Sequence, residues 1–130
     1  MSGVSYVDAS ALLKLVVAEP ESAKMERWFV ESGRVLTSTV GVIETRRAAS
    51  SQAHDATRLA YVLRSVDVIE IGPSIADRAG IVGPPTLRTL DAIHLATALA
   101  LQPDLDGFAT YDDRLAAAAR GLGLPVVSPA

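Results

Sequence analysis

Short apolar runs alternate with longer amphipathic segments along the whole of this 130-residue chain, and that alternation restricts the folds open to it. A short apolar run bounded by turn residues is typical of a buried strand, whereas apolar residues at every third or fourth position are typical of a helix. Strands that alternate with helices form a parallel sheet covered on both faces, so the pattern predicts an α/β fold. The expected strands are residues 4–7, 34–37, 66–71, 107–110 and 126–127.

Amphipathic segments fill the connections between these strands. The expected helices are residues 11–17, a segment opened by Pro20, a segment through Glu44, residues 56–63, a segment starting at Ser74, residues 86–101 and residues 112–120. No repeat, low-complexity stretch or linker divides the chain, and its apolar fraction of 49% is enough for a real core. We therefore expect one domain over residues 1–130.

The composition excludes several classes of protein. With 0 cysteines, the chain can form neither disulfides nor thiolate metal sites. It has no apolar run of the ~20 residues that a membrane-spanning helix needs, and its first residues lack the basic-then-apolar order of a signal peptide. We therefore expect a cytoplasmic protein without membrane contact. The net charge of −3 argues mildly against a broad nucleic-acid binder, but it is compatible with a nuclease whose acidic side chains hold cations.

Four acidic residues lie near strand ends or on the helices that follow. Asp8 directly follows the first strand, and Asp112 follows the fourth by two residues. Glu44 lies early in the helix after the second strand, and Asp91 interrupts the apolar stretch 90–96. Ligands of open parallel sheets bind at the carboxyl ends of the strands, so we expect the four side chains to share one cleft. Carboxylates gathered there repel one another unless cations lie among them, and hard oxygen ligands suit Mg²⁺ or Mn²⁺.

Each acid also has a purely structural interpretation. Asp8 and Asp112 are suited to the N-termini of the helices that they precede. Glu44 is suited to a helix start or to a surface pair with a basic residue one turn away. Asp91 would lie near a helix start, with Arg88 as its counter-ion, if Thr89 were the cap. If the helix starts at residue 86 instead, Asp91 lies beyond the first turn, where an acid on an apolar face is harder to explain structurally.

Four segments, in this order and at these spacings, resemble the successive motifs of the PIN domain. They are YVDASAL at residues 6–12, IE at 43–44, LDAIHLATA at 90–98 and ATYD at 109–112. The resemblance covers nearly the whole chain and is most specific at residues 90–98. It is strongest to the VapC-type toxins of bacterial toxin–antitoxin pairs.

This resemblance implies a three-layer α/β/α sandwich with a central parallel sheet. It implies that Asp8, Glu44, Asp91 and Asp112 hold Mg²⁺ or Mn²⁺ and form the catalytic centre of an endoribonuclease, which hydrolyses RNA with a metal-activated water. It also implies that the chain is the toxin of a type II pair, forms a homodimer and is silenced by a cognate antitoxin. The alternative interpretation is a non-catalytic PIN-like module that binds RNA or protein.

The fourth acid is not unique, because Asp113 follows Asp112. If Thr110 is the N-cap of the last helix, Asp113 occupies the third helical position and reaches back to the cap in a capping box. Asp112 is then free to face the cleft, so we expect Asp112 in the site.

Other polar residues near the predicted cleft have two interpretations each. Ser10 is either a hydrogen-bond donor to a carboxylate or the cap of the first helix. His94 is interpreted as a packed structural histidine, with general-acid chemistry as the alternative. The apolar helix pair over residues 11–32 predicts a contact surface for a dimer or an antitoxin. Four arginines are candidates for contacts with RNA phosphates, with solvated surface as the alternative: Arg46, Arg47, Arg88 and Arg114.

Overall fold

Five parallel strands form the central sheet of the computed structural model, which describes residues 3–130. Residues 1 and 2, the start of the expected domain, lie outside the described part. The strand order is β3-β2-β1-β4-β5, and each neighbouring pair is parallel. All five predicted strands are confirmed, with small differences at their ends: β1 (Val4–Val7), β2 (Arg34–Ser38), β3 (Asp67–Ile69), β4 (Leu105–Ala109) and β5 (Val126–Val127).

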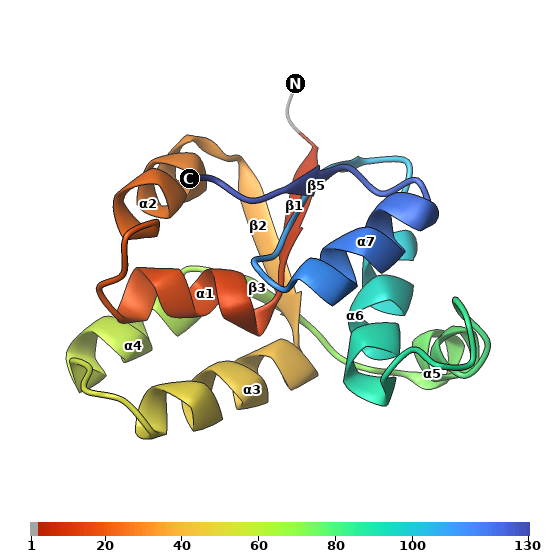
Figure 1. Ribbon diagram of the computed structural model, residues 1–130, viewed down its shortest axis with the longest axis horizontal. Coiled ribbons are helices and arrows are strands. Elements are labelled where there is room, and N and C mark those ends of the chain that lie inside the picture. The colour runs from red at the N-terminus through yellow and green to blue at the C-terminus, as the bar shows by residue number, and fades with distance from the viewer. Residues whose placement is uncertain (1–2) are drawn as a thin grey trace.

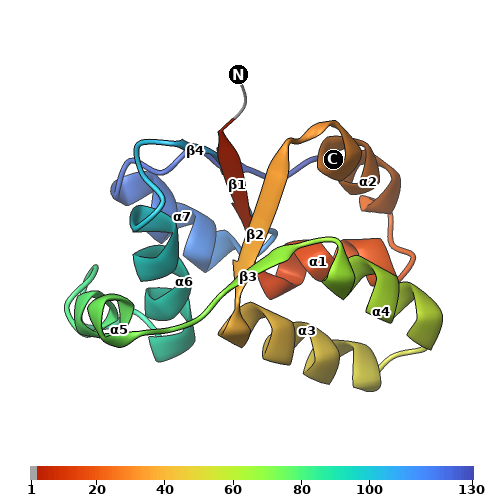
Figure 2. The same cartoon turned by 180° about the vertical axis from the view of Figure 1, so that it is seen from behind.

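Helices cover both faces of the sheet. In Figures 1 and 2, α1 to α4 lie on one face and α5 to α7 on the other, which confirms the predicted three-layer α/β/α sandwich with a central parallel sheet. No helix within residues 3–130 is long and apolar enough to cross a membrane. The helices are α1 (Ala9–Val16), α2 (Ser22–Glu31), α3 (Thr39–Ser50), α4 (Ala56–Arg64), α5 (Pro73–Ala79), α6 (Thr89–Leu99) and α7 (Asp113–Gly121).

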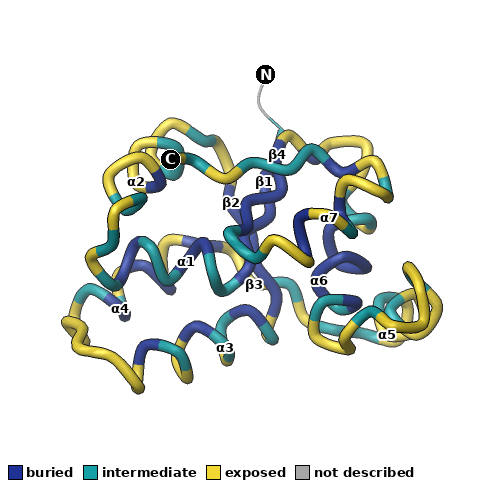
Figure 3. The backbone as a smooth tube through the Cα atoms, in the orientation of Figure 1, coloured by how far each residue is buried: buried dark blue, intermediate teal, exposed yellow. Residues whose placement is uncertain are grey.

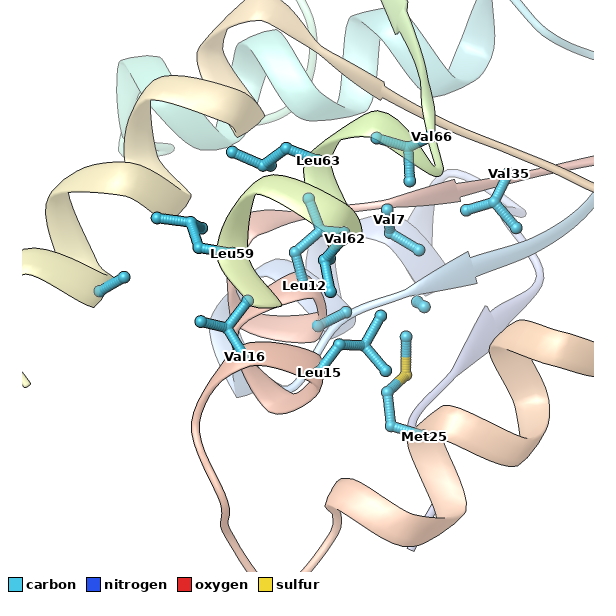
Figure 4. Close-up of a cluster of buried hydrophobic side chains, with 13 residues drawn as sticks. Val7, Leu12, Leu15, Val16, Met25, Val35, Leu59, Val62, Leu63 and Val66 are labelled. Atoms are coloured by element: carbon cyan, nitrogen blue, oxygen red, sulfur yellow. The ribbon is translucent and has the colours of Figure 1, made fainter. Parts of the chain in front are cut away.

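Two buried clusters hold the three layers together. The first core lies between the sheet and α1 to α4 and is shown in Figure 4, where Val7 of β1 and Met25 of α2 both point into it. The second core lies between the sheet and α6 and α7, where Tyr6 of β1 packs with Phe108 and Leu95. Successive residues of β1 therefore point to opposite faces of the sheet. Because both faces are covered, the middle strands are buried, as Figure 3 shows.

One helix near the predicted cleft begins later than its apolar pattern indicated. α6 begins at Thr89 and not at residue 86. Gly83 takes a left-handed backbone conformation (φ 71°), and the following turn is closed by a hydrogen bond from the Leu87 N–H to the Pro84 carbonyl. Asp91 therefore lies in the first turn of α6.

The direction in which the chain adds strands reverses at β1. β2 and β3 lie on one side of β1, and β4 and β5 lie on the other. In open parallel sheets, ligands bind at the carboxyl ends of the strands beside such a reversal. Figure 1 shows the first turns of α1, α3 and α7 near this end of the sheet. The fold therefore places its binding crevice beside the residues that follow β1 and β4.

Candidate functional site

Asp8 is the most enclosed of the four predicted site acids. It follows β1 and is 3% exposed. The register between β1 and β4 places it level with Thr110, whose hydroxyl donates to Asp8 Oδ2 at 2.5 Å. Asp8 Oδ1 accepts from the Ser10 hydroxyl at 2.7 Å and from the Ala11 N–H at 2.9 Å, so Asp8 is also the N-cap of α1. Ser10 is thus the predicted donor to a carboxylate and not the cap.

Burial raises the pKa of the Asp8 carboxyl above its usual value. The hydrogen bonds from Thr110, Ser10 and the Ala11 backbone oppose the shift. That the pKa stays raised means that these donors compensate only in part for the water that the carboxylate has lost. A cation beside Asp8 would stabilise its charged form further.

Glu44 lies on α3 and contacts His94 of α6. Glu44 Oε1 and His94 Nε2 are 2.6 Å apart. On the other side of the ring, Nδ1 lies 2.7 Å from the Tyr6 hydroxyl. His94 is 2% exposed, which agrees with the predicted packed histidine. Its two hydrogen bonds connect a core tyrosine to a predicted site acid, and the sequence did not indicate this connection.

Asp91 is half-buried, and the charges of other acids affect the pKa of its carboxyl. Burial raises the pKa of its carboxyl, and the negative charges of Asp112 and Glu44 raise it further. The positive charge of Arg88 opposes the shift. Electrostatic effects between such groups weaken with distance and are screened by solvent. The acids whose charges act on the Asp91 carboxyl are Asp112 and Glu44.

Asp112 is the N-cap of α7, which corrects the predicted start of this helix. Its Oδ1 accepts from two backbone N–H groups of the first turn, at 2.9 and 3.1 Å. Thr110, the predicted cap, is buried, and its hydroxyl donates to Asp8 instead. Asp113 is the first helical residue and not the third, so it forms no capping box with Thr110.

The four carboxylates suit a divalent cation that keeps part of its water shell better than one bound by protein ligands alone. Among residues 3–130, no three carboxylate or imidazole groups are placed so that they could hold a metal ion by themselves. Mg²⁺, however, usually keeps several waters and binds through one or two carboxylates. Glu44 and Asp112 each use one oxygen in the hydrogen bonds above and keep the other free of donors among the described residues. Both oxygens of Asp91 are free in the same sense, so the cleft offers oxygen ligands for a cation and its waters.

Comparison with known proteins identifies the family of this chain. The family model of the PIN domain matches residues 5–121, a span that includes all four acids. The chain belongs to the PIN-domain family. A curated relative from Mycobacterium tuberculosis, named Ribonuclease VapC47, is 38% identical over 130 residues, with 95% of this chain and 96% of the relative covered. The resemblance inferred from the sequence motifs is confirmed.

Two solved structures share the fold of this PIN domain. One is Mycobacterium tuberculosis VapC20, described as a sarcin–ricin loop cleaving toxin, with a TM-score of 0.74 at 16% identity over 97% of this chain and 99% of that one. The other is a toxin–antitoxin complex from Klebsiella pneumoniae, with a TM-score of 0.71 at 22% identity over 97% of this chain and 98% of that one. At 16% and 22% identity, the similarity to these two structures shows a shared fold and nothing further.

Two contacts beside the PIN-domain cleft were not indicated by the sequence. Thr110 and Asp8 are 102 positions apart, and Tyr6 and His94 are 88 positions apart. Neither contact can be read from local periodicity, which relates only neighbouring turns or strand positions. The one available signal was that all four residues fall inside the segments that resemble PIN motifs.

A cavity of about 540 Å³ adjoins Asp91 between the first turns of α6 and α7. Its lining includes Arg88 and Arg114 together with the apolar side chains of Leu87 and Ala118. Two of the four predicted arginines therefore lie beside the cleft, whereas the other two are exposed on α3. A larger cavity of about 600 Å³ lies between α5 and α6, contains none of the four acids and is not part of this site.

Proposed function

We propose that this PIN domain is a metal-dependent endoribonuclease, the toxin of a type II toxin–antitoxin pair. The observation that carries the proposal is a cleft at the carboxyl ends of β1 and β4, around which Asp8, Glu44, Asp91 and Asp112 lie. The identity of 38% to a relative named as a ribonuclease supports it. The proposed catalytic unit is one domain over residues 1–130, and the proposed cofactor is Mg²⁺ or Mn²⁺.

Asp8 and Asp91 are the proposed metal ligands, either direct or through water. Burial raises the pKa of both carboxyls, so a nearby cation would stabilise their charged forms. Glu44 and Asp112 each keep one oxygen for hydrogen bonds from water, and they would complete the site and orient the attacking water. A bound Mg²⁺ or Mn²⁺ supplies a water of lowered pKa and offsets the negative charge that grows on the phosphate.

Water, and not a side chain, is the proposed nucleophile. Thr110 is buried and its hydroxyl donates to Asp8, whereas the Ser10 hydroxyl donates to Asp8 and accepts from the Tyr111 N–H. The base beside both hydroxyls is a carboxylate, which is a much weaker base than the imidazole that usually activates a serine. The chain has 0 cysteines. In the proposed reaction, water attacks phosphorus and a phosphodiester P–O bond breaks.

Cleavage of RNA is expected to require a divalent cation. The protein would be incubated with single-stranded and loop-containing RNA in Mn²⁺, in Mg²⁺ and after exhaustive chelation. Cleavage should occur with the cation, stop with the chelator and return when the cation is restored. Cleavage that survives chelation would contradict the proposal. RNA binding without cleavage in Mn²⁺ would favour the alternative of a non-catalytic binding module.

The cavity between α6 and α7 is proposed to receive the RNA strand next to the scissile phosphate. Arg88 and Arg114 line it, and arginine binds phosphate oxygens through paired N–H groups. The apolar Leu87 and Ala118 offer a surface against which an unpaired base can pack. The cavity therefore combines a phosphate contact with a base contact beside Asp91.

Arg114→Ala is expected to weaken RNA binding more than catalysis. The Arg114 side chain is exposed on α7, and its removal leaves all four carboxylates in place. We expect KM for an oligonucleotide to rise several-fold, with kcat little changed, and the dependence of KM on salt to decrease because one phosphate contact is lost. Arg120→Ala, near the end of the same helix, is the matched control. If the Arg114→Ala protein had the same KM as the unchanged protein, Arg114 would not be part of the surface that binds RNA.

A second copy of the chain and a cognate antitoxin are the proposed partners. The apolar helix pair that predicted such contacts mostly serves the first core, where Leu12, Leu15 and Met25 are buried. Its exposed part is Val30, which is 73% exposed and lines a groove of about 300 Å³ between α2 and α4 together with Tyr61 of α4. We propose this groove as a partner contact. An RNA substrate would place the protein in the cytoplasm.

A further inference from the structure

We propose that His94 is a positioning residue that fixes Glu44 in the cleft, and that the Tyr6 hydroxyl controls it by holding the imidazole in the tautomer protonated at Nε2. The inference rests on the proposed function, because it concerns how Glu44 is presented to the cation and its waters. Neither His94 nor Tyr6 is proposed to touch the substrate.

A continuous line of hydrogen bonds joins the second core to the cleft. It runs from the Tyr6 hydroxyl to His94 Nδ1 (2.7 Å) and from His94 Nε2 to Glu44 Oε1 (2.6 Å). Tyr6 is 0% exposed and His94 is 2% exposed, whereas Glu44 is half-buried. Only the last member of the line reaches the cleft, so the first two act on the site through Glu44.

The direction of the protons along this line follows from Glu44. A carboxylate oxygen only accepts hydrogen bonds, so the 2.6 Å contact with Glu44 Oε1 requires a proton on His94 Nε2. Burial raises the pKa of Tyr6 well above its usual value, so the phenol keeps its proton and can donate it. A neutral imidazole with its proton on Nε2 accepts at Nδ1, which lies 2.7 Å from the Tyr6 hydroxyl.

Packing holds the ring in this orientation. Tyr6 stacks on Phe108 with ring centroids 5.6 Å apart and meets the His94 ring edge-on at 5.7 Å. On the α3 side, Gly41 lets the helix approach closely, because a Cβ there would lie 2.1 Å from Thr37 Oγ1 and 3.6 Å from His94 Cε1. With neighbours on these sides, the imidazole has one orientation in which both nitrogens are hydrogen-bonded.

Glu44 needs such a constraint because nothing else in the described part of the chain fixes it. Its only hydrogen bond among residues 3–130 is the one from His94. A glutamate with three free torsions loses conformational entropy when it is ordered around a cation, and a side chain ordered in advance loses less. Through Oε1, His94 therefore sets the direction in which the free Oε2 of Glu44 is presented.

The tautomer can be measured directly in the metal-free protein. The chain has 2 histidines, and His54 is exposed, so ¹⁵N NMR of the imidazoles gives two sets of signals, which His54→Gln assigns. We expect the neutral His94 ring to carry its proton on Nε2, and Tyr6→Phe to convert it to a mixture of tautomers. A neutral ring that carries its proton on Nδ1 would overturn the proposal.

The effect on the site can be measured as affinity for Mn²⁺ by titration calorimetry, beside RNA cleavage. Tyr6→Phe keeps the ring stack and removes one hydroxyl, and we expect it to weaken Mn²⁺ binding by roughly tenfold, the lower end of the effects seen when a partner of a metal ligand is lost. Tyr111→Phe removes another hydroxyl that is bonded to a backbone carbonyl, and it should leave the affinity unchanged.

Two substitutions of His94 separate positioning from packing. His94→Gln places an amide N–H donor near the position of Nε2 and should keep Mn²⁺ affinity within a few-fold. His94→Leu fills similar space without a donor and should lose at least as much affinity as Tyr6→Phe. Equal losses for Gln and Leu, or no loss in either, would overturn the proposal. If the unchanged protein binds Mn²⁺ but cleaves no RNA, the proposed function fails while the tautomer and affinity results still decide this inference.

Discussion

Asp91→Asn is expected to lower RNA cleavage by more than ~100-fold while leaving the metal-free protein at least as stable as the unchanged one. Loss of a residue that only supports a metal ligand already costs about 10–100-fold in affinity or activity, and a ligand should cost more. The stability part follows from the charges around Asp91. Burial and the neighbouring Asp112 both raise its pKa, so the ionised carboxylate is held in the empty cleft at a cost in free energy.

The sign of the pH dependence follows from the same shift. The pKa of Asp91 is raised in the folded protein above its usual value of 3.8, so the folded state holds this proton more tightly than the unfolded state. Ionised Asp91 therefore destabilises the fold above its folded-state pKa, and this penalty disappears as the pH falls below about 3.8. We expect the gain in Tm of Asp91→Asn to be present at pH 7 and to shrink as the pH is lowered through this range.

Thermal unfolding with chelator present, together with cleavage assays in Mn²⁺, tests the prediction for Asp91→Asn. Asp77→Asn, an exposed aspartate on α5 outside the cleft, is the matched control and should change neither measurement. A large fall in Tm for metal-free Asp91→Asn would show that Asp91 stabilises the fold by attraction to Arg88. The structural interpretation of Asp91 would then replace the proposed one.

The layers of the fold were predictable because they depend on local patterns. Apolar runs and amphipathic segments define the strands and helices, and their alternation implies a parallel sheet. The start of α6 was not predictable from the same pattern, because Thr86, Leu87 and Arg88 include no glycine or proline that would keep them out of the helix. A turn closed by the hydrogen bond from the Leu87 N–H to the Pro84 carbonyl precedes the helix instead.

The candidate residues were predictable from the sequence, but their hydrogen bonds were not. For Asp8 the structural interpretation is confirmed, because one carboxylate oxygen caps α1, and the same residue lies at the end of β1, where the site is proposed. The roles of Thr110 and Tyr6 depend on strand register and on the packing of α6 against the sheet. A single sequence carries no local signal for contacts across such distances along the chain.

Substitutions of the neighbouring acids Asp112 and Asp113 should have different effects on cleavage and stability. The reason differs from the capping box that the sequence predicted. Asp112 is itself the cap: its Oδ1 accepts two backbone N–H groups of α7, and its negative charge raises the pKa of Asp91. Asn caps helices about as well as Asp, whereas Ala does not. Asp113 is exposed at the first helical position, and its side chain has no hydrogen bond within residues 3–130.

Three variants therefore have three different expected outcomes. Asp112→Asn should keep the cap and the Tm but lose most RNA cleavage, because it removes the charge that faces Asp91. Asp112→Ala should lose cleavage and also about 1 kcal/mol of unfolding free energy, the usual cost of a lost N-cap. Asp113→Asn should change cleavage little and stability by a few tenths of a kcal/mol at most, the scale of a single exposed charge near a helix N-terminus. Cleavage rates in Mn²⁺ and urea unfolding without metal measure both quantities. If Asp113→Asn abolished cleavage while Asp112→Asn did not, Asp112 would be only a helix cap, and Asp113 would be the fourth acid of the site.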